Sequence, residues 1–213
     1  MSSSTSRTSY PLIRAPNPVQ AFGQIGGHVK MGFKAPKGRR TGKAMALVSA
    51  LPLAPGSDQL VLAFIDRSDP EETFDNEPHL GDNQVVIVPK AGVLCSVING
   101  VNAGDWKGVR VALGDPVEEP DDLDVDPTGL DLAASDRWVD MVDELGVDGS
   151  KLGGWPLWAN APVDLDRLMG KPQVFHHRLT GDLIDFKLGD GGVIYVFVDA
   201  DGTGGSLCWQ QAT

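Results

Sequence analysis

The seven residues from Gly38 to Ala44, GRRTGKA, come closest in this sequence to a phosphate-binding loop. In such a loop, backbone N–H groups cradle the phosphates, a lysine contacts them and the next Ser or Thr binds Mg²⁺. Here the spacing between the two glycines is one residue too short, and Ala44 stands where the hydroxyl is required. The segment therefore does not predict a nucleotide site.

Two pairs of polar residues resemble parts of metal sites. His176 and His177 are adjacent in a run predicted to be a strand, so their side chains are expected on opposite faces, unable to bind one metal ion together. Asp199 and Asp201 are spaced like the first ligands of a calcium loop, but the later oxygen ligands and the terminal Glu are missing. The sequence therefore predicts no metal site and no cofactor.

Cysteine and tryptophan supply the remaining candidates for chemistry. Cys95 and Cys208 lie in apolar runs without a neighbouring histidine, which is typical of small buried thiols. Trp155 and Trp158 lie in a loop rich in Gly and Pro, where they either cover the end of a sheet or form an aromatic platform for recognition. Because the sequence holds no recognised nucleophile and base, an enzyme is the least favoured function class.

The composition is that of a soluble globular protein. The chain has 213 residues, of which 41% are hydrophobic and 22% charged, and its formal net charge is −11. A chain of this length can form a core without disulfides or metal. No stretch approaches the roughly 20 apolar residues that span a bilayer, and the opening MSSSTSRTS lacks the apolar region of a secretion signal. We therefore expect a cytoplasmic protein without a membrane partner.

Basic residues are concentrated near the start of the chain. Residues 1–50 contain eight basic residues and no acidic one. The basic loop, as we name it, comprises Lys34, Lys37, Arg39 and Arg40. Such a cluster either contacts phosphate or an acidic partner, or is a solvated loop that neutralises acidic residues of the same chain. Because nucleic-acid-binding domains usually have a basic pI and this chain has one of about 4.6, nucleic acid is not a favoured partner.

Acidic residues dominate the middle of the chain. Residues 115–148 contain thirteen acidic residues and a single basic one, Arg137. The densest part is the predicted partner-binding segment: Glu118, Glu119, Asp121, Asp122, Asp124 and Asp126. An acidic surface of this kind would speed association with a cationic protein. The alternative interpretation is a solubilising, poorly ordered loop.

The chain also contains an internal repeat. The sequence QIGGH at residues 24–28 resembles KLGGW at residues 151–155, and each is followed by Ala-Pro, Gly-Lys and an apolar run that ends in Asp. These runs are LVLAFID at residues 60–66 and VIYVFVD at residues 193–199. The order of the landmarks is kept at offsets between 126 and 133 residues, which indicates a duplication.

Both apolar runs are typical of buried strands, and a second apolar run after each, at residues 85–88 and 207–209, predicts strand pairs. Further strands are expected at residues 93–98 and 109–113. The apolar spacing over residues 131–145 predicts a helix, with Gly146 as its C-cap.

The predicted fold is therefore α+β and β-rich, with duplicated sheet units and few helices. A flexible N-terminal segment, residues 1–20, is expected to precede one globular domain, residues 21–213. Within that domain, repeats at about residues 24–90 and 151–212 are joined by an acidic segment, residues 91–150.

Four segments resemble, in their order, the signature of the YwqG-like family of bacterial proteins. They are KLGGWPLW (residues 151–158), GKPQVF (170–175), GDGGVIYVF (189–197) and CWQ (208–210). The resemblance covers about residues 151–211, and the first repeat departs from it by placing His28 where Trp155 stands. It implies a β-rich fold built from a duplication, no established enzymatic activity, and a candidate role as an immunity protein beside a secreted toxin.

Two functional hypotheses follow. The first is a non-enzymatic protein-binding module, with toxin neutralisation as the candidate role, in which the acidic segment steers a cationic partner and the protein occludes the partner's active site. The alternative is a small-molecule or glycan receptor that uses Trp155 and Trp158 in a cleft between the two repeats.

Overall fold

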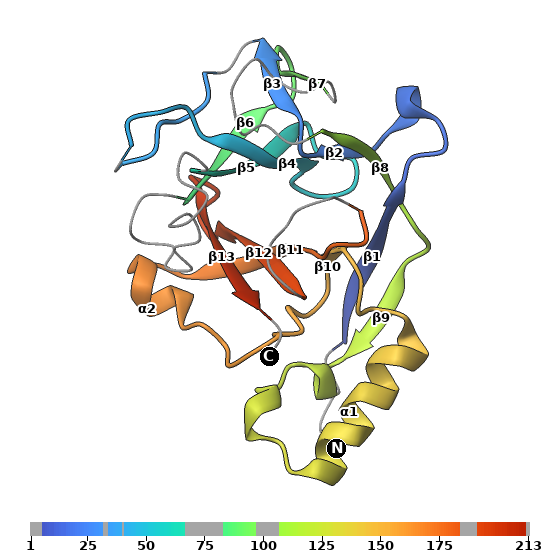
Figure 1. Cartoon of the computed structure of the whole chain (residues 1–213). Helices are drawn as coiled ribbons and strands as arrows, with labels where there is room; N and C mark the ends of the chain where they lie inside the picture. The colour runs from blue at the N-terminus through green and yellow to red at the C-terminus, as the bar shows by residue number, and fades with distance from the viewer. Residues whose placement is uncertain are drawn as a thin grey trace.

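The computed structural model describes residues 6–31, 34–39, 41–66, 83–96, 107–183 and 191–211. These residues are rich in β-strand and include two helices, α1 and α2 (Figure 1). The strands are β1 Ser6–Arg14, β2 Gly23–Ile25, β3 His28–Met31, β4 Ala46–Pro52, β5 Gln59–Ile65, β6 Asn83–Pro89, β7 Leu94–Ser96, β8 Val109–Leu113, β9 Val117–Pro120, β10 Lys151–Gly153, β11 Gln173–Leu179, β12 Gly192–Asp199 and β13 Gly205–Gln211. The helices are α1 Leu132–Leu145 and α2 Leu165–Met169.

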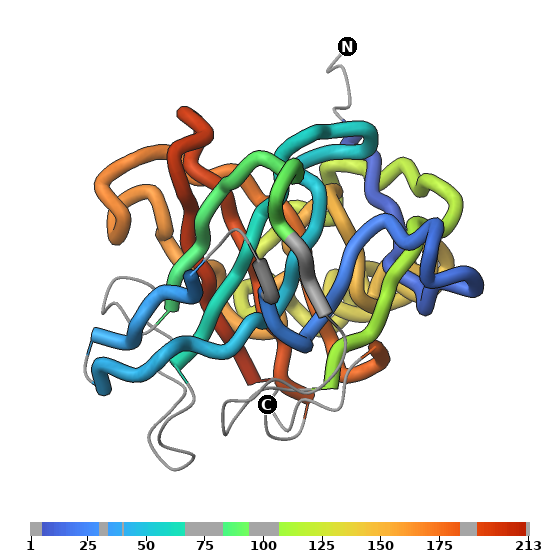
Figure 2. The backbone as a smooth tube through the Cα atoms, turned by 90° about the horizontal axis from the view of Figure 1, so that it is seen from above, coloured from blue at the N-terminus to red at the C-terminus, as the bar shows by residue number. Residues whose placement is uncertain are grey.

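Eleven strands form one antiparallel sheet in the order β10-β11-β12-β13-β6-β5-β4-β2-β8-β1-β9. Because β1 also pairs with β10, the sheet closes on itself, and β9 lies outside the closed ring as a further partner of β1. Figure 2 shows the strands from above. Strands β3 and β7 form a separate two-stranded sheet. No helix in the described parts of the chain is long and apolar enough to cross a membrane.

Strand β1 corrects the prediction of a flexible segment over residues 1–20. Residues 6–14 form a strand that pairs with β8, β9 and β10, and Leu12 is buried in the core. The prediction failed because the polar composition of the first residues hides the strand, whose backbone hydrogen bonds are made to segments more than ninety residues away. Residues 1–5 lie outside the described part of the chain.

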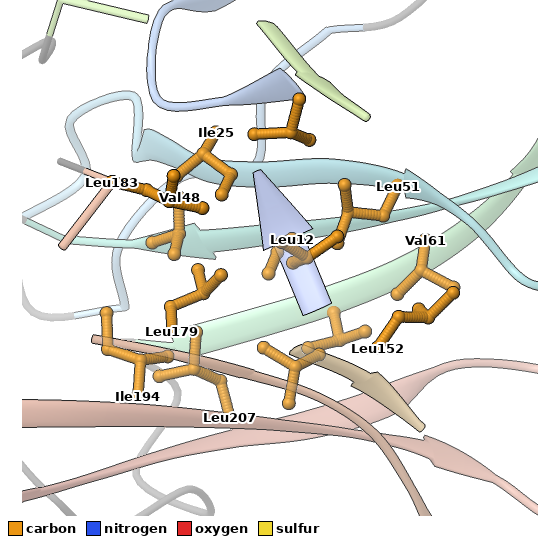
Figure 3. Packing of buried hydrophobic residues seen from close by; sticks show 14 of the residues in the cluster. Leu12, Ile25, Val48, Leu51, Val61, Leu152, Leu179, Leu183, Ile194 and Leu207 are labelled. Carbon is orange, nitrogen blue, oxygen red and sulfur yellow. The ribbon is translucent and has the colours of Figure 1, made fainter. Parts of the chain in front are cut away.

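Apolar side chains fill the interior of the closed sheet. Leu12, Ile25, Val48, Ile194 and Leu207 belong to this cluster, and Figure 3 shows side chains from opposing strands pointing toward one another. Successive side chains of a strand alternate between the two faces, so every second residue faces inward. Full burial of a Leu or Ile side chain contributes about 1.5–3 kcal/mol, which makes this interior the main source of stability.

The outward-facing residues of the ring form further apolar clusters. Phe175, Tyr195 and Phe197 pack with Trp158 and Leu165 outside β11 to β13, under the segment that carries α2. On the other side of the ring, a second cluster forms outside β4 to β6, with Met45, Leu47, Leu60, Leu62 and Phe64. Both faces of the central strands are therefore buried, which explains their nearly continuous apolar sequences.

The sheet contains two sets of four strands whose pairing can be compared residue by residue. We call β2, β4, β5 and β6 the first half and β10, β11, β12 and β13 the second half. Ile25 stands opposite Ser49 in the first half, and Leu152 stands opposite His177 in the second. A β-bulge immediately precedes both Ser49 and His177. The register of the first three strands is therefore the same in the two halves.

Several predicted elements are confirmed. Strands β5 and β6 pair, as do β12 and β13, and β8 spans residues 109–113. Helix α1 begins after Asp131, whose side chain accepts a hydrogen bond from the Ala134 N–H at 2.8 Å, and ends at Gly146 with φ of 62°. Residues 91–150, expected as a connector, supply strand β8 to the closed ring and also contain β9 and α1, which lie outside it.

Candidate functional site

Helix α1 carries the acidic surface of the molecule. Its inner side, with Trp138, Val142 and Leu145, packs against an apolar cluster that includes Leu123 and Trp155. Its outer side exposes acidic residues: Asp136, Asp140, Asp143 and Glu144. Two apolar residues on the same helix are also exposed, Leu132 at 80% and Val139 at 45%.

A groove of about 630 Å³ runs between α1 and the segment of residues 121–130. We name it the acidic groove. Three carboxylates line it, those of Asp122, Asp140 and Glu144, against one basic side chain, that of Arg137. Its apolar lining residues include Val125 and Met141. Such a surface suits a Lys or Arg side chain of a partner, because the aliphatic stem contacts the apolar part while the charged head meets the carboxylates.

The structure separates the acidic residues singled out from the sequence. Asp122 and Asp124 are exposed, and Asp121 is half-buried. The exposed carboxylate of Glu118 accepts hydrogen bonds from the hydroxyls of Ser6 and Thr8, at 3.1 and 2.6 Å. Asp126 is exposed and caps a short turn by accepting a hydrogen bond from the Thr128 N–H at 2.9 Å. Of these residues, Asp122 lines the acidic groove.

Glu119 was predicted to meet a partner protein, and that prediction is wrong. Its side chain is fully buried and lies 2.6 Å from the Lys151 ammonium. Its second oxygen accepts a hydrogen bond from the Trp155 backbone N–H at 2.7 Å. Burial lowers the pKa of Lys151 from 10.5 to about 8, even though the Glu119 charge acts in the opposite direction. The pair therefore ties β9 to β10 inside the protein and is not available to a partner.

Trp155 and Trp158 do not form an exposed platform. They are 7% and 9% exposed, respectively. The Arg7 guanidinium covers the Trp155 ring, with its central carbon 3.8 Å from the ring centroid. Trp158 stacks on Phe197 at a centroid distance of 5.8 Å and leans on Tyr195 at 4.8 Å. Both rings cover the sheet, which is the structural role weighed for them in the sequence.

Trp158 nevertheless contributes to a cavity that the sequence did not reveal. The cavity measures about 440 Å³ and lies between α1 and the outer side of β11 and β12. Its other lining residues include Trp138, Val193, Arg178 and Asp148. Trp138 and Trp158 are twenty residues apart in the chain, and only the packing of α1 on the sheet brings them to one cavity.

A chain of hydrogen bonds in the ring interior was also missed. Ser49 Oγ lies 2.9 Å from His177 Nε2, the Nδ1 atoms of His177 and His176 lie 2.6 Å apart, and His176 Nε2 lies 3.1 Å from the Pro52 carbonyl. A carbonyl only accepts, so His176 Nε2 donates to it. In the neutral rings His177 Nδ1 then donates to His176, and the Ser49 hydroxyl donates to His177 Nε2.

The predicted placement of the two histidines on opposite faces is wrong, because the bulge before His177 turns both rings into the interior. Burial lowers the pKa of His176 to about 4 and that of His177 well below its ordinary value. Although serine and histidine are hydrogen-bonded as in a hydrolase, Ser49 is fully buried. A substrate could not reach the Ser49 hydroxyl, so this series of hydrogen bonds has a structural role.

The basic loop lies on a different side of the molecule from α1. Lys34, Lys37 and Arg39 are exposed, and Figures 1 and 2 show their segment, the blue loop before β4, well away from α1. Arg40 lies outside the described residues. The two charged segments therefore do not neutralise each other by contact, and the charge asymmetry of the sequence becomes an asymmetry in space.

The described residues offer no cluster of three or more His, Cys, Asp or Glu side chains that could hold a metal ion. Asp199, considered as a calcium ligand, accepts a hydrogen bond from Gln173 at 2.7 Å and pairs with Lys171. Cys208 is buried, which raises the pKa of its thiol to about 12. The side chain of Cys95 lies outside the described part.

Comparison with known proteins leaves the family open. No model of a known protein family matches the chain, and no curated protein matches it closely enough to be a relative. The resemblance to the YwqG-like family therefore stays a prediction. What the chain offers for function is its own geometry: an acidic groove beside α1, an apolar cavity that shares Trp138 with this groove, and an enclosed Ser-His-His network.

Proposed function

We propose that the protein is a non-enzymatic protein-binding module that recognises a basic partner through the acidic groove. The observation that carries this proposal is the placement of Asp122, Asp140 and Glu144 around apolar lining residues. A toxin-neutralising immunity protein, which would occlude the active site of a cationic partner, is the specific role that the resemblance to the YwqG-like family suggests.

Charge supports a role of the groove in the rate of association. The formal net charge is −11, and the outer side of α1 adds Asp136 and Asp143 next to the groove. A surface of one sign raises the encounter rate with a partner of opposite sign by roughly 10- to 1,000-fold at low salt. The exposed Leu132 and Val139 would then contribute apolar contact after encounter.

We further propose that the ring arose from two diverged copies of a five-stranded unit, β1-β2-β4-β5-β6 and β8-β10-β11-β12-β13. In support, β1 and β8 pair symmetrically: Leu12 stands opposite Leu113, and Arg14 opposite Val111. Each first strand also pairs with the second strand of the other unit, β8 with β2 and β1 with β10. The two units would thus exchange their first strands, which explains how a duplicated chain forms one closed core.

The test begins with affinity capture of a partner from the native host and purification of the captured protein. The rate at which the captured partner associates with the wild type, and with the variant Asp140→Asn/Glu144→Gln, is then measured at low and high salt. The expected result is an association rate about tenfold lower at low salt, and a weaker salt dependence.

The matched control is Asp58→Asn/Asp115→Asn, which removes the same charge from exposed positions outside the groove. The control should keep most of the wild-type rate. An equal loss in the two variants would show that only net charge matters, and an unchanged rate in the groove variant would overturn the proposed surface.

A further inference from the structure

The cavity between α1 and the second half of the sheet has the dimensions of a ligand site. Its volume of about 440 Å³ falls in the range of roughly 300–1,000 Å³ that holds small molecules. Apolar side chains dominate its lining, with Trp138 and Val139 contributed by α1 and Trp158 and Val193 from the side of the sheet. A planar or branched apolar body fits such walls.

Arg178 gives this apolar cavity a specific chemistry. It is the one basic residue among the lining residues. Its Nη1 donates to the Asp148 backbone carbonyl at 2.7 Å, but no carboxylate of the described residues lies within ion-pairing distance of its guanidinium. Burial lowers the pKa of Arg178, although Tyr195, Asp148 and Asp182 act in the opposite direction. Because neither of these two carboxylates forms an ion pair with the guanidinium, the anionic group of a ligand would be its closest charged partner among the described groups.

Unsatisfied hydrogen-bond donors point to the same kind of ligand. Within the described residues, the Nε–H of Arg178 and the indole N–H of Trp138 are shielded from solvent and have no acceptor. Both residues line the cavity. Trp138 also lines the acidic groove, so the Arg178 Nε–H is the unpaired donor that belongs to this cavity alone. Buried donors are normally paired, and a molecule that brings an acceptor would pair this one. The carboxylate of Asp148, also in the lining, disfavours a ligand with several negative charges.

We propose that this cavity binds a small monocarboxylate with an apolar body, whose carboxylate pairs with Arg178 while the body packs between Trp138 and Trp158. The cavity shares Trp138 with the acidic groove, but none of the three groove carboxylates lines it, so a small molecule bound here is tested independently of the proposed partner binding. It also replaces the aromatic platform expected from the sequence: Trp158 is retained as a contact residue, and Trp138 takes the place of Trp155.

Isothermal titration with phenylpropionate tests the site, and the uncharged phenylpropanol serves as the matched probe. The wild type should bind the acid at least about tenfold more tightly than the alcohol, the difference expected for a charge-assisted hydrogen bond. Arg178→Gln should weaken binding of the acid by a similar factor and leave binding of the alcohol unchanged. Arg167→Gln, which removes the same charge from an exposed position on α2, should bind both probes as the wild type does.

A second variant keeps the test decisive if Arg178→Gln does not fold. Val139→Trp, at a half-exposed position on α1, should fill the cavity and abolish binding while Arg178 is retained. The proposal is overturned if the wild type does not bind phenylpropionate, if acid and alcohol bind equally, or if Val139→Trp binds the acid as the wild type does.

Discussion

The two halves of the closed sheet have the same register in their first three strands but differ in the side chains that they bury. At three buried positions that the register matches, the first half has Gln24, Val48 and Ser49, none of which titrates near neutral pH. The second half has Lys151, His176 and His177 at the corresponding places. The same strand register therefore accommodates buried ionisable side chains when each is ion-paired or hydrogen-bonded.

The partners of these ionisable residues come from different places. Lys151 is paired by Glu119 of β9, a strand outside the closed ring, whereas His177 is hydrogen-bonded to Ser49, its matched residue in the first half. The hydrogen bond between Ser49 and His177 therefore joins the two halves. From this comparison we expect charge-removing substitutions and low pH to lower the free energy of unfolding mainly through residues of the second half.

The largest effect is expected from Lys151→Gln, which places the first-half residue in the second half. The substitution leaves the fully buried Glu119 carboxylate without its cation, so the free energy of unfolding should fall by about 3–5 kcal/mol. Urea unfolding followed by tryptophan fluorescence measures the change. The exposed Lys90→Gln is the control and should stay within about 0.5 kcal/mol of the wild type.

A double variant sharpens this prediction. Adding Glu119→Gln to Lys151→Gln removes the uncompensated charge and should recover part of the lost stability. If the double variant is as unstable as the single one, the loss is due to packing, and the assignment of Lys151 and Glu119 as an electrostatic pair is wrong.

The pH dependence of stability should also reside in the second half. Burial lowers the pKa of His176 from 6.5 to about 4, so at intermediate pH the unfolded chain binds a proton that the folded chain excludes. Stability is therefore expected to fall as the pH decreases from 6.5 through 4, by about 3 kcal/mol for His176 alone. Denaturant midpoints across this pH range measure it.

Exchange of the two histidines for their first-half counterparts provides the control for the pH effect. His176→Val/His177→Ser should flatten the stability profile between pH 6.5 and 4 relative to the wild type, whatever its stability at neutral pH. A profile as steep as that of the wild type would assign the acid sensitivity to the carboxylates instead.

The smallest effects should fall equally on the two halves. Gly42 precedes β4 and Gly170 precedes β11, with φ of 66° and 69°, and a Cβ at either would meet no atom within 4 Å. Gly42→Ala and Gly170→Ala should therefore each cost only the strain of a left-handed backbone, about 1–2 kcal/mol. Thermal or urea unfolding of both variants checks the equality.

Gly154→Ala is the contrasting variant for this pair. Its φ is 73°, and an added Cβ would lie 2.5 Å from both carboxylate oxygens of Glu119, so the cost should exceed that of Gly170→Ala. A clear inequality between Gly42→Ala and Gly170→Ala would show that backbone strain is not the only cost at these two positions. Equal costs at Gly154 and Gly170 would contradict the close packing of Glu119 against Gly154.

Local sequence patterns predicted those elements whose cause is local. Helix α1 was found from its apolar spacing and from the glycine that ends it, and strands β5 and β12 from short apolar runs. Strand β1 was missed because its polar sequence becomes a strand only through pairing with β8, β9 and β10. The acidic groove itself was not predicted: of its three carboxylates, Asp122 was among the residues chosen from the sequence, and Asp140 and Glu144 were not.

The sequence by itself determined the β-rich fold, the position of α1 and the division of charge along the chain, because hydrophobic period, capping and charge are properties of neighbouring residues. The tertiary structure alone decided the roles of the polar side chains. A single bulge turned His176 and His177 to the same side, and a strand outside the ring brought Glu119 to Lys151. Contacts between distant segments depend on register and packing, which no local pattern specifies.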